Sequence, residues 1–173
     1  MFWEFVATVS MAFAAAGVVL LLNRLLGGRL PRWLTPVAAG LAMLGFTIWM
    51  EYSWLSRTLG TLPDEVVVAS TNETRAAYRP WTYLVPLTTR FSAVDHGATM
   101  RHPQHPEMLL TSVLLLGRWE AGYDIRVMFD CADNRRADLL RGAAFAEDGT
   151  LENAEWRDLP ADDPLLRAAC DGV

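Results

Sequence analysis

The chain has 173 residues, of which 52% are hydrophobic and 20% charged, and its formal net charge at pH 7 is −5. The apolar excess lies before residue 55, whereas the region after residue 51 carries 12 arginines and 18 acidic residues, a net charge of −6. That balance argues against a nucleic-acid-binding surface or a polybasic lipid-binding surface, and the length leaves room for one soluble domain beside the apolar region.

Two stretches in the N-terminal third have the length and composition of membrane-spanning helices. Residues 5–22 and 33–50 each contain no charged side chain. At about 1.5 Å per residue, each stretch nearly crosses a hydrocarbon core of about 30 Å. We therefore predict a two-helix transmembrane hairpin over residues 1–54 and one water-soluble domain over residues 55–173. A cleaved signal peptide is the alternative for the first stretch, but its flank holds Glu4 and no basic residue.

The connector between the two stretches predicts the orientation of the hairpin. It holds Arg24, Arg29 and Arg32 without an acidic residue, whereas Glu4 and Glu51 flank the outer ends. Under the positive-inside rule the connector lies in the cytoplasm, so both termini and the soluble domain are expected on the periplasmic side of a bacterial inner membrane. Four tryptophans near the ends of the stretches are expected in the headgroup layer. They are Trp3, Trp33, Trp49 and Trp54.

The two spans are better suited to docking than to transport. Neither contains an ionisable residue, which argues against an ion or proton path through the hairpin alone. Small residues at a spacing of four, Ala12 with Ala16 and Ala38 with Ala42, permit close helix contact. We therefore expect the hairpin to lie in a lipid bilayer and to pack on a larger membrane protein.

Cys131 and Cys170 are the only cysteines in the chain. The predicted orientation places both in an oxidising compartment, where pairing is the default, so we predict one disulfide. Two buried free thiols in a cytosolic domain are the alternative, and they would require the orientation rule to fail. A zinc site is disfavoured because two isolated cysteines supply too few ligands.

The first half of the soluble domain has mainly strand signals. Residues 55–64 are polar and turn-rich, and the β-branched residues in 65–70 predict a first strand. Residues 78–94 mix aromatic and β-branched side chains with Pro80 and Pro86, which favours an edge strand or a bent strand broken by turns.

The second half of the soluble domain predicts a hairpin and a terminal helix. Apolar residues 108–116, a turn at 117–122 and the alternating residues 123–129 are typical of a β-hairpin. A further strand over 137–146 and a tight turn at 147–149 follow, and Asp162-Asp163-Pro164 opens a short helix that ends near Cys170. The predicted fold class is α+β, with a small antiparallel sheet and a C-terminal helix held by the disulfide.

The segment 129–170 resembles the C-terminal pattern of surface-adhesin protein E-like domains of bacterial envelopes. The resemblance rests on a strand-borne Asp-Cys followed by basic residues, a turn with Asp-Gly, a Trp near a Pro, and a Cys in a closing helix. The residues concerned are Asp130, Cys131, Arg135, Arg136, Phe145, Asp148, Gly149, Trp156, Pro160 and Cys170. It implies an envelope location, a β-rich fold and a bridge between the two cysteines. It does not carry over adhesion to host proteins.

All three histidines fall in one short window together with two methionines. The candidate ligands are His96, Met100, His102, His105 and Met108. Thioether and imidazole groups suit copper, so copper binding or delivery is one hypothesis for this window. The competing interpretation is an ordinary exposed loop around Pro103 and Pro106, where such residues occur without a ligand.

No pattern in the sequence predicts a catalytic site. There is no G-x-S-x-G motif and no glycine-rich phosphate loop, and the paired acids 147–148 and 162–163 fall where turns and helix starts use them. We therefore predict a non-enzymatic accessory or assembly subunit of a bacterial inner-membrane complex, without a nucleic-acid or nucleotide partner and without a cofactor. Two alternatives remain, copper or cofactor delivery through residues 96–108 and an envelope ligand-binding domain.

Overall fold

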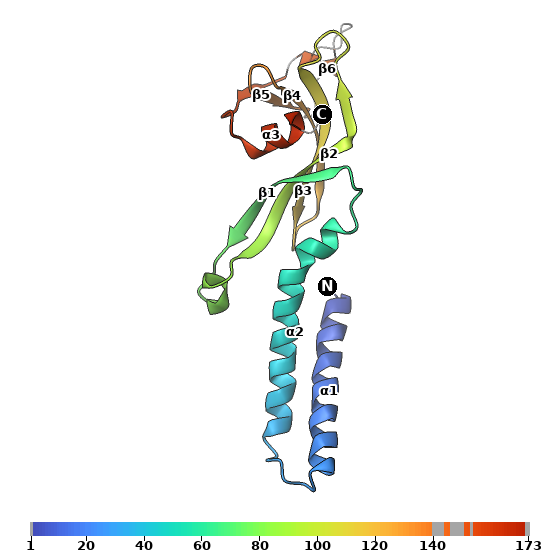
Figure 1. Cartoon of the computed structure of the whole chain (residues 1–173), viewed down its shortest axis with the longest axis vertical. Coiled ribbons are helices and arrows are strands. Elements are labelled where there is room, and N and C mark those ends of the chain that lie inside the picture. Colours follow the sequence, from blue (N-terminus) through green and yellow to red (C-terminus); the bar gives the residue numbers. More distant parts are fainter. Residues whose placement is uncertain (1, 140–143, 146–150, 153, 172–173) are drawn as a thin grey trace. The chain divides into compact units, whose positions relative to one another are not determined.

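A computed structural model describes residues 2–139, 144–145, 151–152 and 154–171. The chain divides into two compact units, residues 1–57 and residues 58–173. The first unit holds helix α1 (Phe2–Leu25) and most of helix α2 (Leu34–Leu59), and the second holds the strands and helix α3 (Figure 1).

Both helices of the first unit are long and apolar enough to cross a membrane. Ala12, Ala16, Ala38 and Ala42 are each partly buried, while larger apolar side chains such as Phe13 are exposed. Large apolar side chains are thus exposed along α1 and along α2 as far as Trp49, the reverse of a water-soluble helix pair. The predicted stretch 5–22 lies within α1, and the stretch 33–50 lies within α2 except for Trp33, which precedes the helix. Helix α2 continues through residues that were expected to form a polar exit.

The second unit contains a six-stranded antiparallel sheet of order β1-β2-β3-β4-β5-β8 and a two-stranded sheet of β6 and β7. The elements are β1 (Val66–Thr74), the 3-10 helix η1 (Pro80–Tyr83), β2 (Leu87–Arg101), β3 (Met108–Gly117), β4 (Tyr123–Asp130), β5 (Arg135–Asp138), β6 (Ala144–Phe145), β7 (Leu151–Glu152), β8 (Trp156–Asp158) and α3 (Pro164–Cys170). The antiparallel sheet, the β3–β4 hairpin and the terminal helix are confirmed.

The prediction of an edge strand over 78–94 is wrong. Pro80 starts η1 and Pro86 immediately precedes β2, so neither proline interrupts the strand. Strand β2 is 15 residues long and lies between β1 and β3. Both prolines lie in the connection before β2 and restrict its backbone. They are compatible with an interior strand because a proline outside the ladder removes no inter-strand hydrogen bond.

The prediction of an exposed loop over 96–108 is also wrong for its first half. Residues up to Arg101 continue β2, and Met100 and Arg101 still pair with Leu110 and Leu109 of β3. The register is irregular between Asp95 and Met100, where extra residues bulge out of the ladder. Only residues 102–107 connect the two strands.

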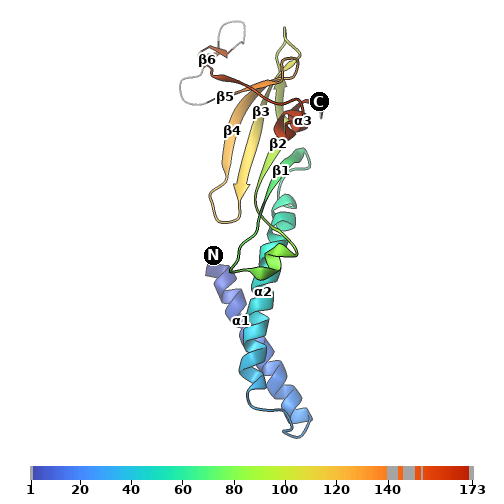
Figure 2. The same cartoon turned by 90° about the vertical axis from the view of Figure 1, so that its left-hand side faces the viewer.

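Helix α3 covers one face of the sheet and contacts β1, β2, β3 and β4 (Figures 1 and 2). The helix begins as predicted, because the Asp163 carboxylate accepts hydrogen bonds from the backbone N–H groups of Leu165 and Leu166 at 3.0 and 3.1 Å. The core beneath the helix consists of Val94, Val113, Val127, Phe129, Leu166 and Ala169. Burying these side chains is the main favourable term for the fold of this unit.

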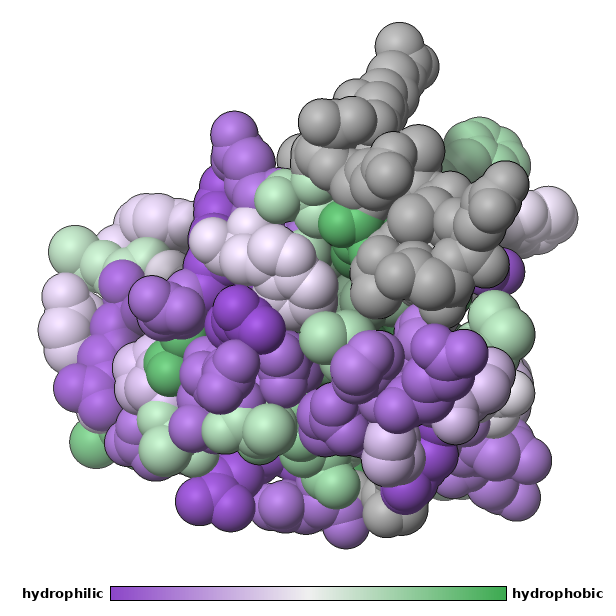
Figure 3. All heavy atoms as spheres, turned by 90° about the horizontal axis from the view of Figure 1, so that it is seen from above, coloured by the Kyte–Doolittle hydropathy of each residue, from purple (hydrophilic) through white to green (hydrophobic). Residues whose placement is uncertain are grey.

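The Cys131–Cys170 disulfide is confirmed and joins the residue after β4 to the last residue of α3, with Cα atoms 6.0 Å apart. The expected strand over 137–146 corresponds to β5 and β6, and residues 140–143 and 146 between and after them lie outside the described residues. The expected turn at 147–149, with Asp148 and Gly149 of the adhesin-like pattern, lies outside the described residues as well. Seen from above in Figure 3, the drawn surface is mainly hydrophilic, with apolar residues scattered among the polar ones.

Candidate functional site

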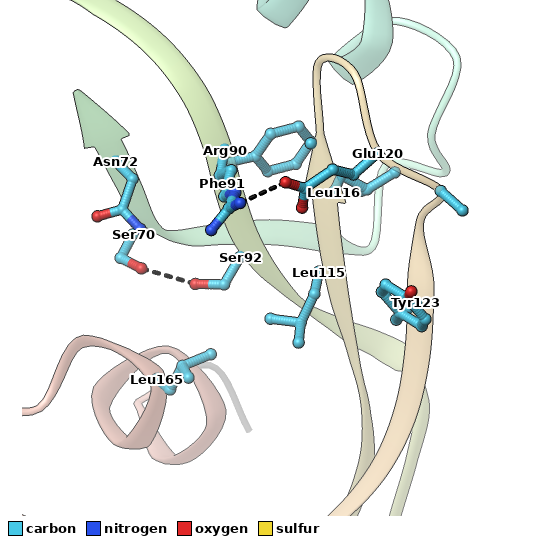
Figure 4. Close-up of a pocket in the computed structure, with 12 residues that line it drawn as sticks. Ser70, Asn72, Arg90, Phe91, Ser92, Leu115, Leu116, Glu120, Tyr123 and Leu165 are labelled. Atoms are coloured by element: carbon cyan, nitrogen blue, oxygen red, sulfur yellow. Dashed lines mark hydrogen bonds and ion pairs between the residues drawn. The ribbon is translucent and has the colours of Figure 1, made fainter. Parts of the chain in front are cut away.

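A cleft of about 340 Å³ lies in the second unit on the face of the sheet that α3 covers (Figure 4). Strands β1 to β4, the β3–β4 turn and one residue of α3 line it. The lining residues are Ser70, Asn72, Arg90, Phe91, Ser92, Leu115, Leu116, Gly117, Glu120, Ala121, Tyr123 and Leu165.

Strand register explains which side chains meet in the cleft. Ser92 of β2 pairs with Leu115 of β3, and Leu115 pairs with Tyr123 of β4. Directly paired residues of an antiparallel sheet project to the same face, so these three form one row across the floor. Ser70 extends the row onto β1, and Leu165 of α3 faces the row from the helix side.

The polar end of the cleft is an ion pair between Arg90 and Glu120. Both side chains are more than half exposed, so the pair stabilises the fold by at most about 1 kcal/mol. Gly117 pairs with Arg90, and a Cβ atom there would lie 3.3 Å from Cβ of Glu120 and 3.6 Å from Cγ of Arg90. The glycine therefore leaves room for the ion pair to fold over the end of the hairpin.

The cleft is equipped for binding more than for catalysis. The hydroxyl groups of Ser70 and Ser92 are 2.6 Å apart and hydrogen-bond to each other. Glu120 is the only carboxylate among the described residues that line the cleft, and Arg90 holds it, so no lining group is placed to take a proton from either serine. An apolar floor with a few hydroxyl and amide groups suits the capture of a small amphipathic molecule.

The three histidines of the proposed copper window do not lie together. His96 is in β2 and lines a shallow hollow between β1 and α3, beside Asp162 and Arg167. Its backbone N–H donates to the carbonyl of Glu65 at 3.0 Å. Both ring nitrogens are inaccessible to solvent and have no hydrogen-bond partner among the described residues.

His102 and His105 lie in the β2–β3 turn, with ring centroids 5.2 Å apart. His102 is buried, and its Nδ1 accepts hydrogen bonds from the backbone N–H groups of Gln104 and His105 at 3.2 and 3.1 Å. His105 is more exposed, and its Nδ1 lies 3.2 Å from Oε1 of Glu107. One ring nitrogen of His102 is therefore already used to hold the turn.

The two methionines of the window flank this turn on the strands, Met100 on β2 and Met108 on β3, and Met100 is exposed. Within the described ranges, no group of three or more His, Cys, Asp or Glu side chains is arranged to hold a metal ion. Copper binding stays a prediction, and metal content after replacement of all three histidines would test it.

The predicted membrane-interface residues differ in their surroundings. Trp3, Trp33 and Trp49 are exposed, as a ring in a headgroup layer would be, whereas Trp54 is only 5% exposed. Arg24 lies in the last turn of α1, and Arg29 and Arg32 lie in the connector, where Gly27 and Gly28 adopt positive φ angles of 67° and 78°. These left-handed conformations allow the chain to turn back within a few residues.

Comparison with known proteins gives no relatives, because no protein-family model, curated protein or solved structure matches the chain. The resemblance of segment 129–170 to adhesin-like domains therefore stays a prediction. Sequence reasoning did not find the cleft. Its polar pair joins residues 30 positions apart, and only the strand register brings them together.

Proposed function

We propose that the chain is a non-enzymatic accessory or assembly subunit of a membrane protein complex, anchored in a bacterial inner membrane by its two helices. The observation that carries the proposal is the inverted helix pair of the first unit. Bulky apolar residues are exposed along α1 and along α2 as far as Trp49. Exposed to water, such a surface would drive aggregation, whereas lipid tails or the helices of a partner satisfy it.

The disulfide supports placing the soluble unit outside the cytoplasm. The Cys131–Cys170 bond ties α3 to the sheet, and bonds of this kind persist in oxidising compartments such as the periplasm. Arginines in the α1–α2 connector favour a cytoplasmic connector by an independent rule. The disulfide and the connector arginines both favour an exported soluble unit, with both chain ends on the periplasmic side of the membrane.

Crosslinking in native membranes tests the subunit hypothesis. The full chain is crosslinked, solubilised in mild detergent and purified, and co-purifying proteins are identified by mass spectrometry. Recovery of one larger membrane protein in near-stoichiometric amount is the expected result. Recovery of the chain alone, as a monomer or a homo-oligomer, would contradict it.

Protease accessibility tests the orientation. Protease added to spheroplasts should digest residues 58–173 and leave the α1–α2 connector intact. Inverted membrane vesicles provide the control, because only the connector should be accessible there. Digestion of the soluble unit in inverted vesicles alone would place it in the cytoplasm and remove the export part of the proposal.

The cleft favours a second candidate function, an envelope domain that binds a small amphipathic ligand. The row of Ser92, Leu115 and Tyr123 provides the floor for it. Full chain purified from native membranes should then carry a small molecule that is lost from Leu115→Trp, because the larger ring fills the floor. Leu20→Trp, on the exposed surface of α1, is the matched control and should retain it. Equal amounts in both variants would eliminate the cleft as the binding site.

A further inference from the structure

Two turns of the second unit lie at the same end of the sheet. The β1–β2 connection, residues 75–86, follows the pairing of Thr74 with Leu87, and the β3–β4 turn, residues 118–122, follows the pairing of Gly117 with Arg90. Leu87 and Arg90 both lie near the start of β2, so the two turns are neighbours at that end (Figure 2).

These turns present large apolar side chains to the surroundings. Leu84 is 87% exposed, Tyr78 is 79% exposed, and Tyr83 and Val85 are each 58% exposed, while Trp119 of the second turn is 49% exposed. We call these five residues the aromatic tip. Single exposed apolar residues need no explanation, but a cluster on a projecting turn marks an interaction surface.

Hydrogen bonds within the β1–β2 connection hold most of the aromatic tip in this conformation. Thr82 is fully buried beneath η1, and its hydroxyl accepts a hydrogen bond from the backbone N–H of Ala76 at 3.0 Å and donates to the carbonyl of Arg79 at 2.7 Å. Pro80 occupies the first turn of η1 and fixes its backbone. Because the turn is ordered around Thr82, its apolar residues point outward in the free protein and lose little conformational freedom on contact.

The charge of the tip differs from that of the unit that carries it. The two turns, residues 75–86 and 118–122, contain three arginines and one acidic residue, Glu120, whereas residues 58–173 contain 11 arginines and 18 acidic residues. The guanidinium of Arg79 lies over the ring of Tyr78 at 5.4 Å, and that of Arg118 lies over Trp119 at 4.7 Å. Exposed tyrosine, tryptophan, aliphatic residues and arginine are the combination that anionic headgroup layers favour.

The chain connection between α2 and the tip is short enough for the tip to reach a membrane that α2 would leave. Six residues, 60–65, separate α2 from β1 and span at most about 20 Å. Strand β1 then leads directly to the tip over nine residues, about 30 Å. The tip is therefore at most about 50 Å along the chain from the end of α2, a separation that permits contact with the same bilayer.

We propose that the aromatic tip inserts into the headgroup layer of the bilayer that holds α1 and α2. This inference rests on the membrane anchoring in the proposed function and adds a lipid contact of the soluble unit. Exposed aromatic side chains beside an excess of arginine favour an anionic headgroup layer, and a protein partner at the tip is one outcome of the test.

Photocrosslinking of the full chain in native membranes tests the proposal. A benzophenone amino acid replaces Leu84 in one protein and Gln104, in the exposed turn at the other end of β2, in a matched control. After irradiation, mass spectrometry should find phospholipid adducts at position 84 at least tenfold above those at position 104. Adducts with a protein at position 84, or adducts with neither lipid nor protein, would overturn the proposal.

Charge reversal gives an independent test. The double variant Arg75→Glu/Arg79→Glu should lower the lipid adduct at position 84 severalfold, because anionic headgroups would then repel the tip. Arg101→Glu, at the other end of β2, is the control and should leave the adduct unchanged. Equal amounts of lipid adduct at position 84 in the unaltered protein, the double variant and Arg101→Glu would overturn the role of charge. Carbonate extraction separates the two hypotheses: release of the full chain contradicts the anchoring itself, whereas retention without a lipid adduct contradicts only the tip contact.

Discussion

Arg135 donates two hydrogen bonds to one oxygen of Asp130, from Nε at 3.0 Å and from Nη2 at 2.8 Å to Oδ2. The other oxygen, Oδ1, accepts from the backbone N–H groups of Ala132 and Asp133 at 3.2 and 3.3 Å. A carboxylate that is only 2% exposed is thereby satisfied on both oxygens. The pair closes the β4–β5 turn directly beside the disulfide.

Asp130→Asn should destabilise the soluble unit by about 2 kcal/mol, because it removes a charge-assisted bond and turns an amide donor toward Arg135. Chemical denaturation of the full chain, followed through Trp156, measures this loss of stability. Trp156 is suited to it because the guanidinium of Arg135 lies 5.0 Å from its ring. Asp133→Asn is the control. Asp133 also pairs with Arg135, at 2.9 Å, but it is 65% exposed, so its loss should cost less than about 1 kcal/mol.

The difference in free energy of unfolding between wild type and Asp130→Asn should be the same at pH 7 and pH 9. The hydrogen bond to Asp130 raises the pKa of Arg135 above its ordinary value, despite an opposing effect of burial. A raised basic pKa means that this stabilisation is fully present below the unfolded-state pKa, far above pH 9, and is lost only as the pH rises through the folded-state value. A difference that shrinks between pH 7 and pH 9 would contradict this assignment.

Replacing both cysteines by alanine should lower the free energy of unfolding of the soluble unit by up to about 4 kcal/mol. The bond joins residues 39 positions apart, and the chain-entropy model gives a value of this size for such a loop. Denaturation of wild type under reducing conditions is the control and should reproduce the double variant. Equal stability of oxidised wild type and double variant would show that α3 holds without the bond.

His96→Leu should stabilise the soluble unit by about 1 kcal/mol. The two ring nitrogens are inaccessible and lack a partner among the described residues, and a leucine of similar size removes the cost of burying them. Thermal unfolding of the full chain measures the effect. His105→Leu, whose side chain is about half exposed, should show no gain.

His102→Leu should destabilise the β2–β3 turn by about 1 kcal/mol, because two backbone N–H groups lose their acceptor. His102→Asn should recover most of the loss, since a side-chain oxygen near the backbone can accept the same bonds. Amide hydrogen exchange at Gln104 and His105 reports directly on the turn. Unchanged exchange in His102→Leu would show that the ring does not hold it.

Elements set by neighbouring residues could be predicted from the sequence. The β3–β4 hairpin follows from alternation around a short polar turn, and α3 follows from Asp163 and Pro164 at its start. The two cysteines had only each other as partners, so their pairing required no knowledge of the fold.

Features that depend on sheet order could not be predicted. The prolines before β2 suggested an edge strand. Strand β2 is an interior strand because β1 and β3 pair with its two edges, and no local sequence pattern predicts which strands pair. The same limit applies to the cleft and to Arg135, whose main partner, Asp130, is buried in the preceding strand. Four of the five residues of the aromatic tip fall within 78–94, which was expected to be strand, and the fifth, Trp119, lies in the predicted turn at 117–122.

Because α3 is the last element of the soluble unit, the apolar face of Val94, Val113 and Phe129 stays uncovered throughout most of synthesis. The helices and the first four strands emerge before the segment that shields this face. Until Leu166 packs on the sheet and the Cys131–Cys170 bond forms, the half-built sheet therefore exposes an apolar face, the feature that makes folding intermediates prone to aggregate.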